Sequence, residues 1–188
     1  MQLDVDEAKR IADLYMYGIL DSGFEERFDR LTRIASAIFK TPIALVSLVD
    51  TQRQWFKSSH GLDVRQTSRD VAFCSHAIRA PEVFVVPDAT KDARFAQNPL
   101  VTAGPHIRFY AGAPLITPGR HALGTLCVID YQPRPEFTPS DQSTLKDLAD
   151  TVMDFFELQR AMRIAKAEVR KGTRGAQPAA GLRRSQPG

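Results

Sequence analysis

Two pairs of strand-like segments in the middle of the chain, each joined by a short turn, limit what this sequence can fold into. The run 43–50 (IALVSLVD) is short, aliphatic and nearly continuous, which is typical of a central strand covered on both faces. Residues 54–58 follow a short turn and complete a predicted hairpin. Residues 107–115 and 123–130 form a second hairpin around the turn signal Pro118-Gly119. The centre of the protein is therefore predicted to be an antiparallel sheet.

Helical patterns frame these hairpins at both ends of the chain. Apolar residues recur at helical spacing over 4–17 and 28–39, and the start signal Thr138-Pro139 opens a long third helix. A short helix over 70–80 and a short strand at 83–86 are predicted between the hairpins. Antiparallel hairpins with helices outside them favour an α+β fold over a doubly wound parallel sheet.

Charge is divided unevenly along the chain. Its 188 residues carry a formal net charge of +3, with a pI near 9.0. Residues 160–188 contribute +7, from eight Lys and Arg against one Glu, and the preceding residues carry −4. The high pI thus describes the C-terminal segment and not the folded body, so we expect no nucleic-acid partner. From about Lys171 the composition predicts a disordered basic tail.

Cysteine content and hydropathy favour a cytoplasmic protein. The chain has only two cysteines, which excludes a Cys-rich zinc module and a disulfide scaffold. No apolar run approaches the ~18–20 residues needed to cross a bilayer. The acidic N-terminus MQLDVDEAKR does not fit a secretory signal. We therefore expect a cytoplasmic location and no membrane partner.

Ordered sequence blocks in this chain resemble the GAF domain family. They are PIALVSLVD, QWFKS, DVAFCSHAI, VVPDATKDARFAQNPLV, PHIRFYAGAPL and ALGTLCVID. More narrowly, they are similar to the GAF sensors of bacterial histidine kinases and diguanylate cyclases. The resemblance covers about residues 20–160. It leaves residues 1–19 as an N-terminal helix and 161–188 as a helix extension with the basic tail.

This resemblance implies a GAF/PAS-like fold and a small-molecule pocket. N- and C-terminal helices would pack on one face of a six-stranded antiparallel sheet, and short helices and loops would enclose the pocket on the other. Members of the family bind cyclic nucleotides, bilins, haem or amino-acid derivatives, and the cofactor of this chain is unknown from its sequence. The cyclic-nucleotide signature is absent, since the single Asn98 precedes a proline. The Cys-His pair of bilin attachment is interrupted in Cys74-Ser75-His76.

Candidate ligand-binding residues come from these blocks. Aromatic side chains would supply apolar walls, and polar ones would fix a ligand's orientation by hydrogen bonds or charge. Structural roles are the alternative: Trp55 and Phe73 in the core, Asp88 in a turn, and Arg94 paired with an acid at the surface. The histidines are scattered, so no metal site is predicted. The full set of candidates is Trp55, Phe73, Cys74, His76, Asp88, Arg94, Phe109 and Tyr110.

No motif of hydrolases or phosphoryl-transfer enzymes occurs in the sequence, so we expect a protein that is not an enzyme. One alternative is a thiol-dependent reductase of an oxidised small metabolite such as free methionine sulfoxide. That chemistry needs a nucleophilic cysteine and a resolving partner. Cys74 and Cys127 are far apart in the sequence, and the clustered cysteines of such enzymes are missing.

The long C-terminal helix carries a second pattern. Its apolar residues step by three and four, which indicates either a short heptad seam or the inner face of a helix packed on its own sheet. We expect a stand-alone sensory module that forms a homodimer through its terminal helices and signals to a separate effector protein. A ligand-free dimerisation scaffold is the other hypothesis. The seam residues are Leu145, Leu148, Val152, Phe155, Gln159 and Met162.

Overall fold

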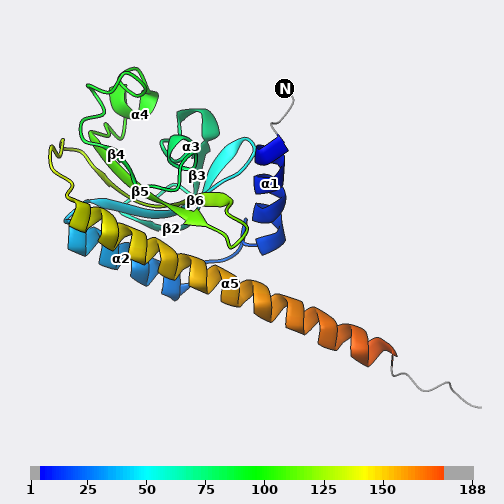
Figure 1. The fold of residues 1–188 in the computed structure, drawn as a ribbon. Coiled ribbons are helices and arrows are strands. Elements are labelled where there is room, and N and C mark those ends of the chain that lie inside the picture. The colour runs from blue at the N-terminus through cyan, green and yellow to red at the C-terminus, as the bar shows by residue number, and fades with distance from the viewer. Residues whose placement is uncertain (1–4, 176–188) are drawn as a thin grey trace, which may run out of the picture.

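The two predicted hairpins lie side by side in one six-stranded antiparallel sheet (Figure 1). The computed structural model describes residues 5–175, with side chains through residue 171. The strand order is β3-β2-β1-β6-β5-β4, so β1 and β6 meet at the centre, and the edge strands β3 and β4 are only three residues long. The strands are β1 (Ile43–Val49), β2 (Arg53–His60), β3 (Gln66–Ser68), β4 (Phe84–Val86), β5 (Phe109–Ile116) and β6 (Ala122–Asp130).

Helices α2 and α5 lie on the opposite side of this sheet from the short helices, and α1 stands at one end of the sheet (Figure 1). Residues of all three long helices join the hydrophobic core on one face, and the short helices pack on the other face with their connecting loops. This arrangement confirms the predicted α+β fold. The long helices are α1 (Val5–Tyr17), α2 (Glu26–Phe39) and α5 (Pro139–Gly175). The short ones are the 3-10 turn η1 (Arg69–Val71), α3 (Cys74–Ala77) and α4 (Pro99–Thr102).

Side chains of each strand alternate between two cores, one on each face of the sheet. In β2, Trp55 joins the core under the long helices and Phe56 joins the opposite core. In β5, Phe109 and Tyr110 divide in the same way. The expectation that Trp55 and Phe109 wall the pocket is therefore corrected. A period of two makes neighbouring residues face opposite ways, but it does not say which face the helices cover.

Two short elements differ from the prediction. Strand β3 is polar and only three residues long, so no apolar alternation marks it in the sequence. The single helix predicted over 70–80 is broken, because Ala72 has an extended backbone (φ −78°, ψ 122°) between η1 and α3. At this break, Asn98 Nδ2 donates to the Val71 carbonyl at 2.9 Å. A side chain from a later loop thus supplies a hydrogen bond that the broken helix lacks.

Helix α5 packs on the sheet along its first half and then extends away from the body (Figure 1). Leu145, Val152 and Phe156 are fully buried, and every described side chain from Ala161 onward is exposed. Part of the predicted seam is therefore the inner face of a helix packed on its own sheet. The disorder predicted from about Lys171 is corrected for the first residues, since α5 continues to Gly175, and the rest of that prediction falls on residues 176–188, outside the described residues.

A buried lysine joins the sheet to α5 near the point where that helix leaves the body. The Lys57 side chain is 0% exposed, its Nζ lies 2.7 Å from Glu25 Oε1, and it also donates to two groups of residues 22–23. Glu25 in turn accepts a hydrogen bond of 2.7 Å from Gln159 Nε2 on α5. The preceding residue, Phe56, lies in the core of the opposite face. One dipeptide of β2 thus contacts both layers.

Candidate functional site

A cavity of about 440 Å³ lies between the sheet and the short helices. Its walls come from five strands of the sheet, β1, β2, β3, β5 and β6, and from the segments around α3 and α4. None of its lining residues carries a charge. Most are apolar, among them Ile43, Leu45, Phe56, Phe73, Ile107 and Ile129. A partly open apolar cavity of this size falls within the range of small-molecule sites.

Two polar groups of this cavity have no hydrogen-bond partner among the described residues. They are the Gln54 amide oxygen and the Thr67 hydroxyl. The two residues are direct neighbours across β2 and β3, and Gln54 is only 6% exposed. Leaving a buried polar group unsatisfied costs roughly 1–3 kcal/mol, so such groups are usually completed by a ligand or water. This pair is therefore the candidate polar contact for a molecule bound in the cavity.

Stacked aromatic rings hold one wall of the cavity. The Phe73 and Phe95 rings are 4.0 Å apart with 8° between their planes, and the Phe73 and Tyr110 rings are 5.3 Å apart. Phe95 is only 1% exposed, so it anchors the long connection between β4 and α4 on the short-helix face. Sequence reasoning missed Phe95, because nothing in the irregular segment around it shows an apolar period.

The two cysteines meet beside the cavity. Cys74 Sγ lies 4.0 Å from Cys127 Sγ, and both are buried free thiols. The Tyr110 and Thr125 hydroxyls donate to Cys74 Sγ at 3.2 and 3.1 Å. Burial raises the pKa of the Cys74 thiol, but hydrogen bonds from Cys127 and from neighbouring hydroxyls lower it to about 7. The fold thus creates a cysteine cluster that spacing in the sequence did not predict.

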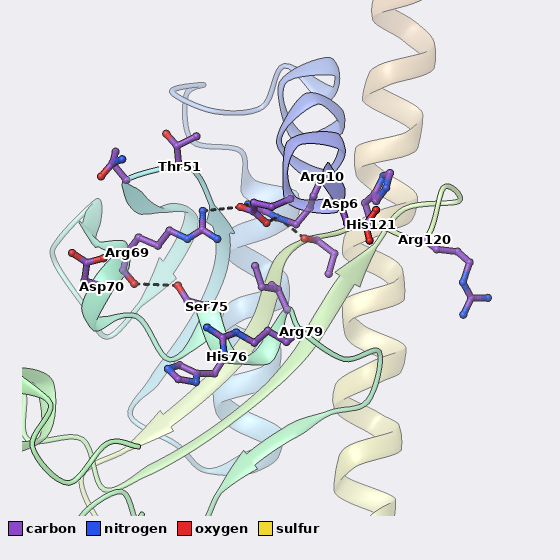
Figure 2. A pocket seen from close by; sticks show the side chains of 14 residues that line it. Asp6, Arg10, Thr51, Arg69, Asp70, Ser75, His76, Arg79, Arg120 and His121 are labelled. Carbon is purple, nitrogen blue, oxygen red and sulfur yellow. Dashed lines mark hydrogen bonds and ion pairs between the residues drawn. The ribbon is translucent and has the colours of Figure 1, made fainter. Parts of the chain in front are cut away.

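A second, open groove of about 1010 Å³ lies beside α1 (Figure 2). Its central charges are paired with one another, since Glu7 contacts both Arg10 and Arg69 at 2.7 Å. Burial raises the pKa of Glu7, yet these arginines outweigh it and lower the pKa to about 2. Arg10 also donates to the Val49 carbonyl of β1 at 2.8 Å. The paired charges dock α1 on the sheet, so we place the candidate ligand site in the apolar cavity.

Three of the predicted ligand-binding residues line this cavity: Phe73, Cys74 and Tyr110. His76 lines the groove instead, and its ring lies edge-on to Phe95 at 4.8 Å. Burial, followed by the charges of nearby arginines, lowers the pKa of His76. The residues described by the structure include no group of three or more His, Cys, Asp or Glu that could hold a metal ion.

The remaining polar candidates have local partners at the surface. Asp88 accepts hydrogen bonds from Thr90 and pairs with Lys91 at 3.1 Å, which fits a turn-forming role. Arg94 pairs with Asp92 at 2.5 Å. Neither Asp88 nor Arg94 lines the cavity. Across residues 5–175, no helix combines the length and apolar character needed to cross a membrane.

The GAF domain family matches residues 23–154, and this chain belongs to that family. Among curated proteins, the chain is similar to a cyclic di-GMP phosphodiesterase of Pseudomonas aeruginosa. The two are 49% identical over 148 residues, which are 79% of this chain and 25% of the relative. The chain thus spans about a quarter of the length of that enzyme.

Solved structures support the same fold. The GAF domain of Thermosynechococcus elongatus PixJ, in its blue-light absorbing form, has a TM-score of 0.63 and 13% identity. The match covers 90% of this chain and 98% of that domain. A free methionine-R-sulfoxide reductase from Neisseria meningitidis, in complex with its substrate, has a TM-score of 0.60 and 17% identity, covering 86% and 96%. At these identities the likeness concerns the fold alone.

Proposed function

We propose that this chain is a cytoplasmic sensory module that binds a small uncharged molecule in the cavity and signals to an effector through α5. The observation that carries the proposal is a partly open apolar cavity whose lining includes two residues with unsatisfied polar groups, Gln54 and Thr67. Membership in the GAF family, whose fold is shared by sensory domains, supports it. A ligand-free dimerisation scaffold is the alternative that the binding test below distinguishes.

The lining of the cavity defines the chemistry of its ligand. A charged ligand would lose its hydration against a wall without counter-charges, which costs several kcal/mol or more. The unsatisfied Gln54 oxygen calls for a hydrogen-bond donor on an otherwise apolar body. By the same reasoning a dianion such as cyclic di-GMP, named in the relative from Pseudomonas, is disfavoured here. The proposed ligand is therefore a neutral, mainly apolar compound with one N–H or O–H group.

A short chain of contacts connects the cavity with α5. Phe56 lines the cavity, and its neighbour Lys57 faces the long helices. Lys57 contacts Glu25, and Glu25 accepts from Gln159 of α5. A ligand that favours one position of β2 would therefore bias the polar contacts that hold α5 where it leaves the body. This is a population shift, whose size is limited by the ligand's differential affinity for the two states.

The class of effector is proposed from the relative whose sequence includes a segment similar to this chain. In the relative from Pseudomonas, the region similar to this chain makes up a quarter of a protein named as a cyclic di-GMP phosphodiesterase. We take the regulated partner of this module to be an enzyme domain of signalling, either in another protein or in a longer form of this one.

Three small aromatic probes test the ligand class. Indole, with one N–H donor, is expected to bind and to stabilise the protein in thermal unfolding, by roughly 2.7 kcal/mol at a concentration 100 times Kd. Naphthalene, which lacks the donor, should bind more weakly, and indole-3-acetate, which is charged, should not bind. Gln54→Leu should remove the preference for indole over naphthalene.

A cavity-filling variant and a matched control complete this test. Leu100→Trp replaces an aliphatic side chain of the cavity wall with a larger indole ring, which should fill the space and abolish binding of both neutral probes. Ile38→Trp, at a half-exposed site on α2, should leave binding unchanged. If no probe stabilises the unmodified protein, or if Leu100→Trp binds indole as well as the unmodified protein does, the cavity is not a ligand site and the scaffold hypothesis is favoured.

Helix α5 offers a surface for the proposed homodimer, on a different register from the predicted seam. Leu148, Phe155, Met162 and Val169 recur every seven residues, with Thr151, Leu158 and Ala165 between them. Leu158 is 52% exposed, Met162 49% and Val169 68%, while Leu148 and Phe155 are half-buried. This spacing is that of a parallel two-helix seam.

Charge placed in this seam is expected to separate the dimer. Sedimentation equilibrium should give a dimer for the unmodified protein at roughly tens of micromolar, a concentration at which a weak dimer is populated. Leu158→Glu with Met162→Glu should raise the dissociation constant by at least about 100-fold, because each buried carboxylate loses hydration without a partner. Ala167→Glu, at an exposed site more than one turn beyond Met162 and on the other side of the helix, should leave it unchanged. An unmodified chain that stays monomeric at these concentrations would contradict the proposal.

A further inference from the structure

The two sulfur atoms beside the cavity are close enough to react with each other after a small shift. Cys74 lies at the start of α3 and Cys127 in the middle of β6, with 4.0 Å between the sulfurs. A disulfide bond needs about 2.05 Å, so one sulfur must move by about 2 Å. Helix α3 has only four residues, which makes it the movable side of the pair. No other cysteine competes, since the chain has two in all.

The surroundings of the pair give the two thiols different roles. The Tyr110 and Thr125 hydroxyls both donate to Cys74 Sγ, which favours its thiolate. A hydrogen bond to Cys74, together with burial, raises the pKa of Cys127 well above its usual range. Gly112 leaves the room that this arrangement needs, because a Cβ there would lie 2.2 Å from the Tyr110 hydroxyl oxygen. Cys74 is therefore the nucleophile and Cys127 the protonated partner.

We take the route to Cys74 to be through the cavity, because the residue is buried but belongs to the cavity lining. Cys74 is 1% exposed but lines the cavity, whose other lining residues include Val64, 47% exposed, and the exposed Gly104. A reagent that reaches the sulfur by this route must be small and uncharged, and an apolar body would be retained by the walls. This step rests on the proposed role of the cavity as a small-molecule site.

We infer that Cys74 and Cys127 form an oxidant-responsive thiol pair, which a small organic hydroperoxide converts to an intramolecular disulfide inside the cavity. The Cys74 thiolate attacks the terminal peroxide oxygen, the O–O bond breaks, and the alkoxide leaves as an alcohol with the proton lost by Cys74. Cys127 sulfur then attacks the resulting sulfenic acid. The S–S bond forms, and hydroxide leaves as water with the proton of Cys127. Two thiols and one hydroperoxide thus yield one disulfide, one alcohol and one water.

The disulfide would change the cavity that admits the oxidant. It would bind the start of α3 covalently to β6 and pull Cys74 away from its hydroxyl donors. Phe73, the preceding residue, forms part of the cavity wall. Oxidation would therefore alter the same wall that a neutral ligand contacts. One site would then respond both to ligand binding and to an oxidant.

The reduced full chain, treated with cumene hydroperoxide, tests this inference. The mass should fall by about 2 Da, the difference of two hydrogens, and N-ethylmaleimide added in denaturant should label two thiols before treatment and none after. The reaction should be at least tenfold faster than with hydrogen peroxide at equal concentration, and its rate should rise with pH through about 7. In Cys127→Ser, dimedone should trap a sulfenic acid on Cys74, and Cys74→Ser should not react.

Further results decide between a reactive thiol pair and a purely structural one. Tyr110→Phe should slow the reaction and move its pH midpoint upward, which a purely structural role of the hydroxyl would not do. Two thiols that survive in the folded protein but oxidise in urea would overturn the inference, as would a disulfide between two chains. If indole still binds when the thiols are inert, only this inference fails. If the thiols oxidise as described but no aromatic probe binds, the proposed function fails instead.

Discussion

Replacing Gly124 with alanine is expected to lower the thermal midpoint of unfolding by at least about 6–12 °C, or to abolish folding. Gly124 pairs with Leu48 between the two central strands, and a Cβ there would lie 1.9 Å from the Ser47 carbonyl oxygen and 2.8 Å from Leu48 Cα. These are backbone atoms, so they cannot move without parting β1 from β6. Overpacking of this kind costs about 3 kcal/mol or more.

Strand propensity alone predicts that this substitution stabilises the protein. Alanine is better than glycine inside a strand by roughly 0.5–1 kcal/mol, because it loses less backbone entropy on folding. The steric cost is several times larger, so we expect it to dominate. Gly23→Ala is the matched control, since nothing lies within 4 Å of a Cβ built there. Circular dichroism on heating checks both, and a Gly124→Ala protein as stable as the unmodified one would contradict the close contact.

Lys57→Met is expected to cost about 3 kcal/mol of unfolding free energy. Its ammonium group donates to Ser22 Oγ at 2.8 Å and Gly23 O at 2.7 Å, and lies 2.7 Å from Glu25 Oε1. Removing one partner of a buried pair leaves the other uncompensated, which typically costs about 3–5 kcal/mol. The lower end applies, since the Glu25 side chain is 26% exposed, keeps an ion pair with Arg27 at 3.0 Å and also accepts from Gln159.

A second variant separates the ion pair from simple packing. Lys57→Met with Glu25→Gln should recover roughly half of the lost stability, because the half-buried carboxylate that has lost its lysine partner is then replaced by a neutral amide. Urea unfolding measures the free energies. Hydrogen exchange should show faster opening of residues 22–25 and of the α5 turn around Gln159 in the single variant. Equal stability of the single variant and the unmodified protein would mean that the contacts of the buried lysine do not stabilise the fold.

The order of the main elements could be predicted from the sequence, because long periodic segments carry it. The apolar run 43–50 became β1, and the two hairpins became the middle of the sheet. Shorter pieces could not be predicted in the same way. Strand β3 has three polar residues, and beside the break at Ala72 the Val71 carbonyl accepts a hydrogen bond from the Asn98 amide of a distant loop. Contacts of that kind exist only once the chain is folded.

The site was predicted in part, for reasons that particular residues make clear. Cys74, Phe73 and Tyr110 line the cavity, and their role in binding a ligand stays a prediction. Trp55 and Phe109 lie on the opposite face, since alternation alone does not assign the faces. Gln54 and Thr67 gave no signal, because an ordinary polar residue becomes notable only when it is buried without a partner. The pairing of Cys74 with Cys127 likewise arises from the packing of α3 on β6.

The three-residue edge strands β3 and β4 restrict how copies of this protein can associate. A neighbouring chain that tried to extend the sheet at β3 or β4 would find only a few free N–H and C=O groups, too few to hold a register. Sheet extension is also open-ended, because each added copy exposes a new border. Pairing through helices is self-limiting, since two copies related by a two-fold axis use up the same surface on each other. Assemblies of this chain should therefore remain finite in size even when it is concentrated.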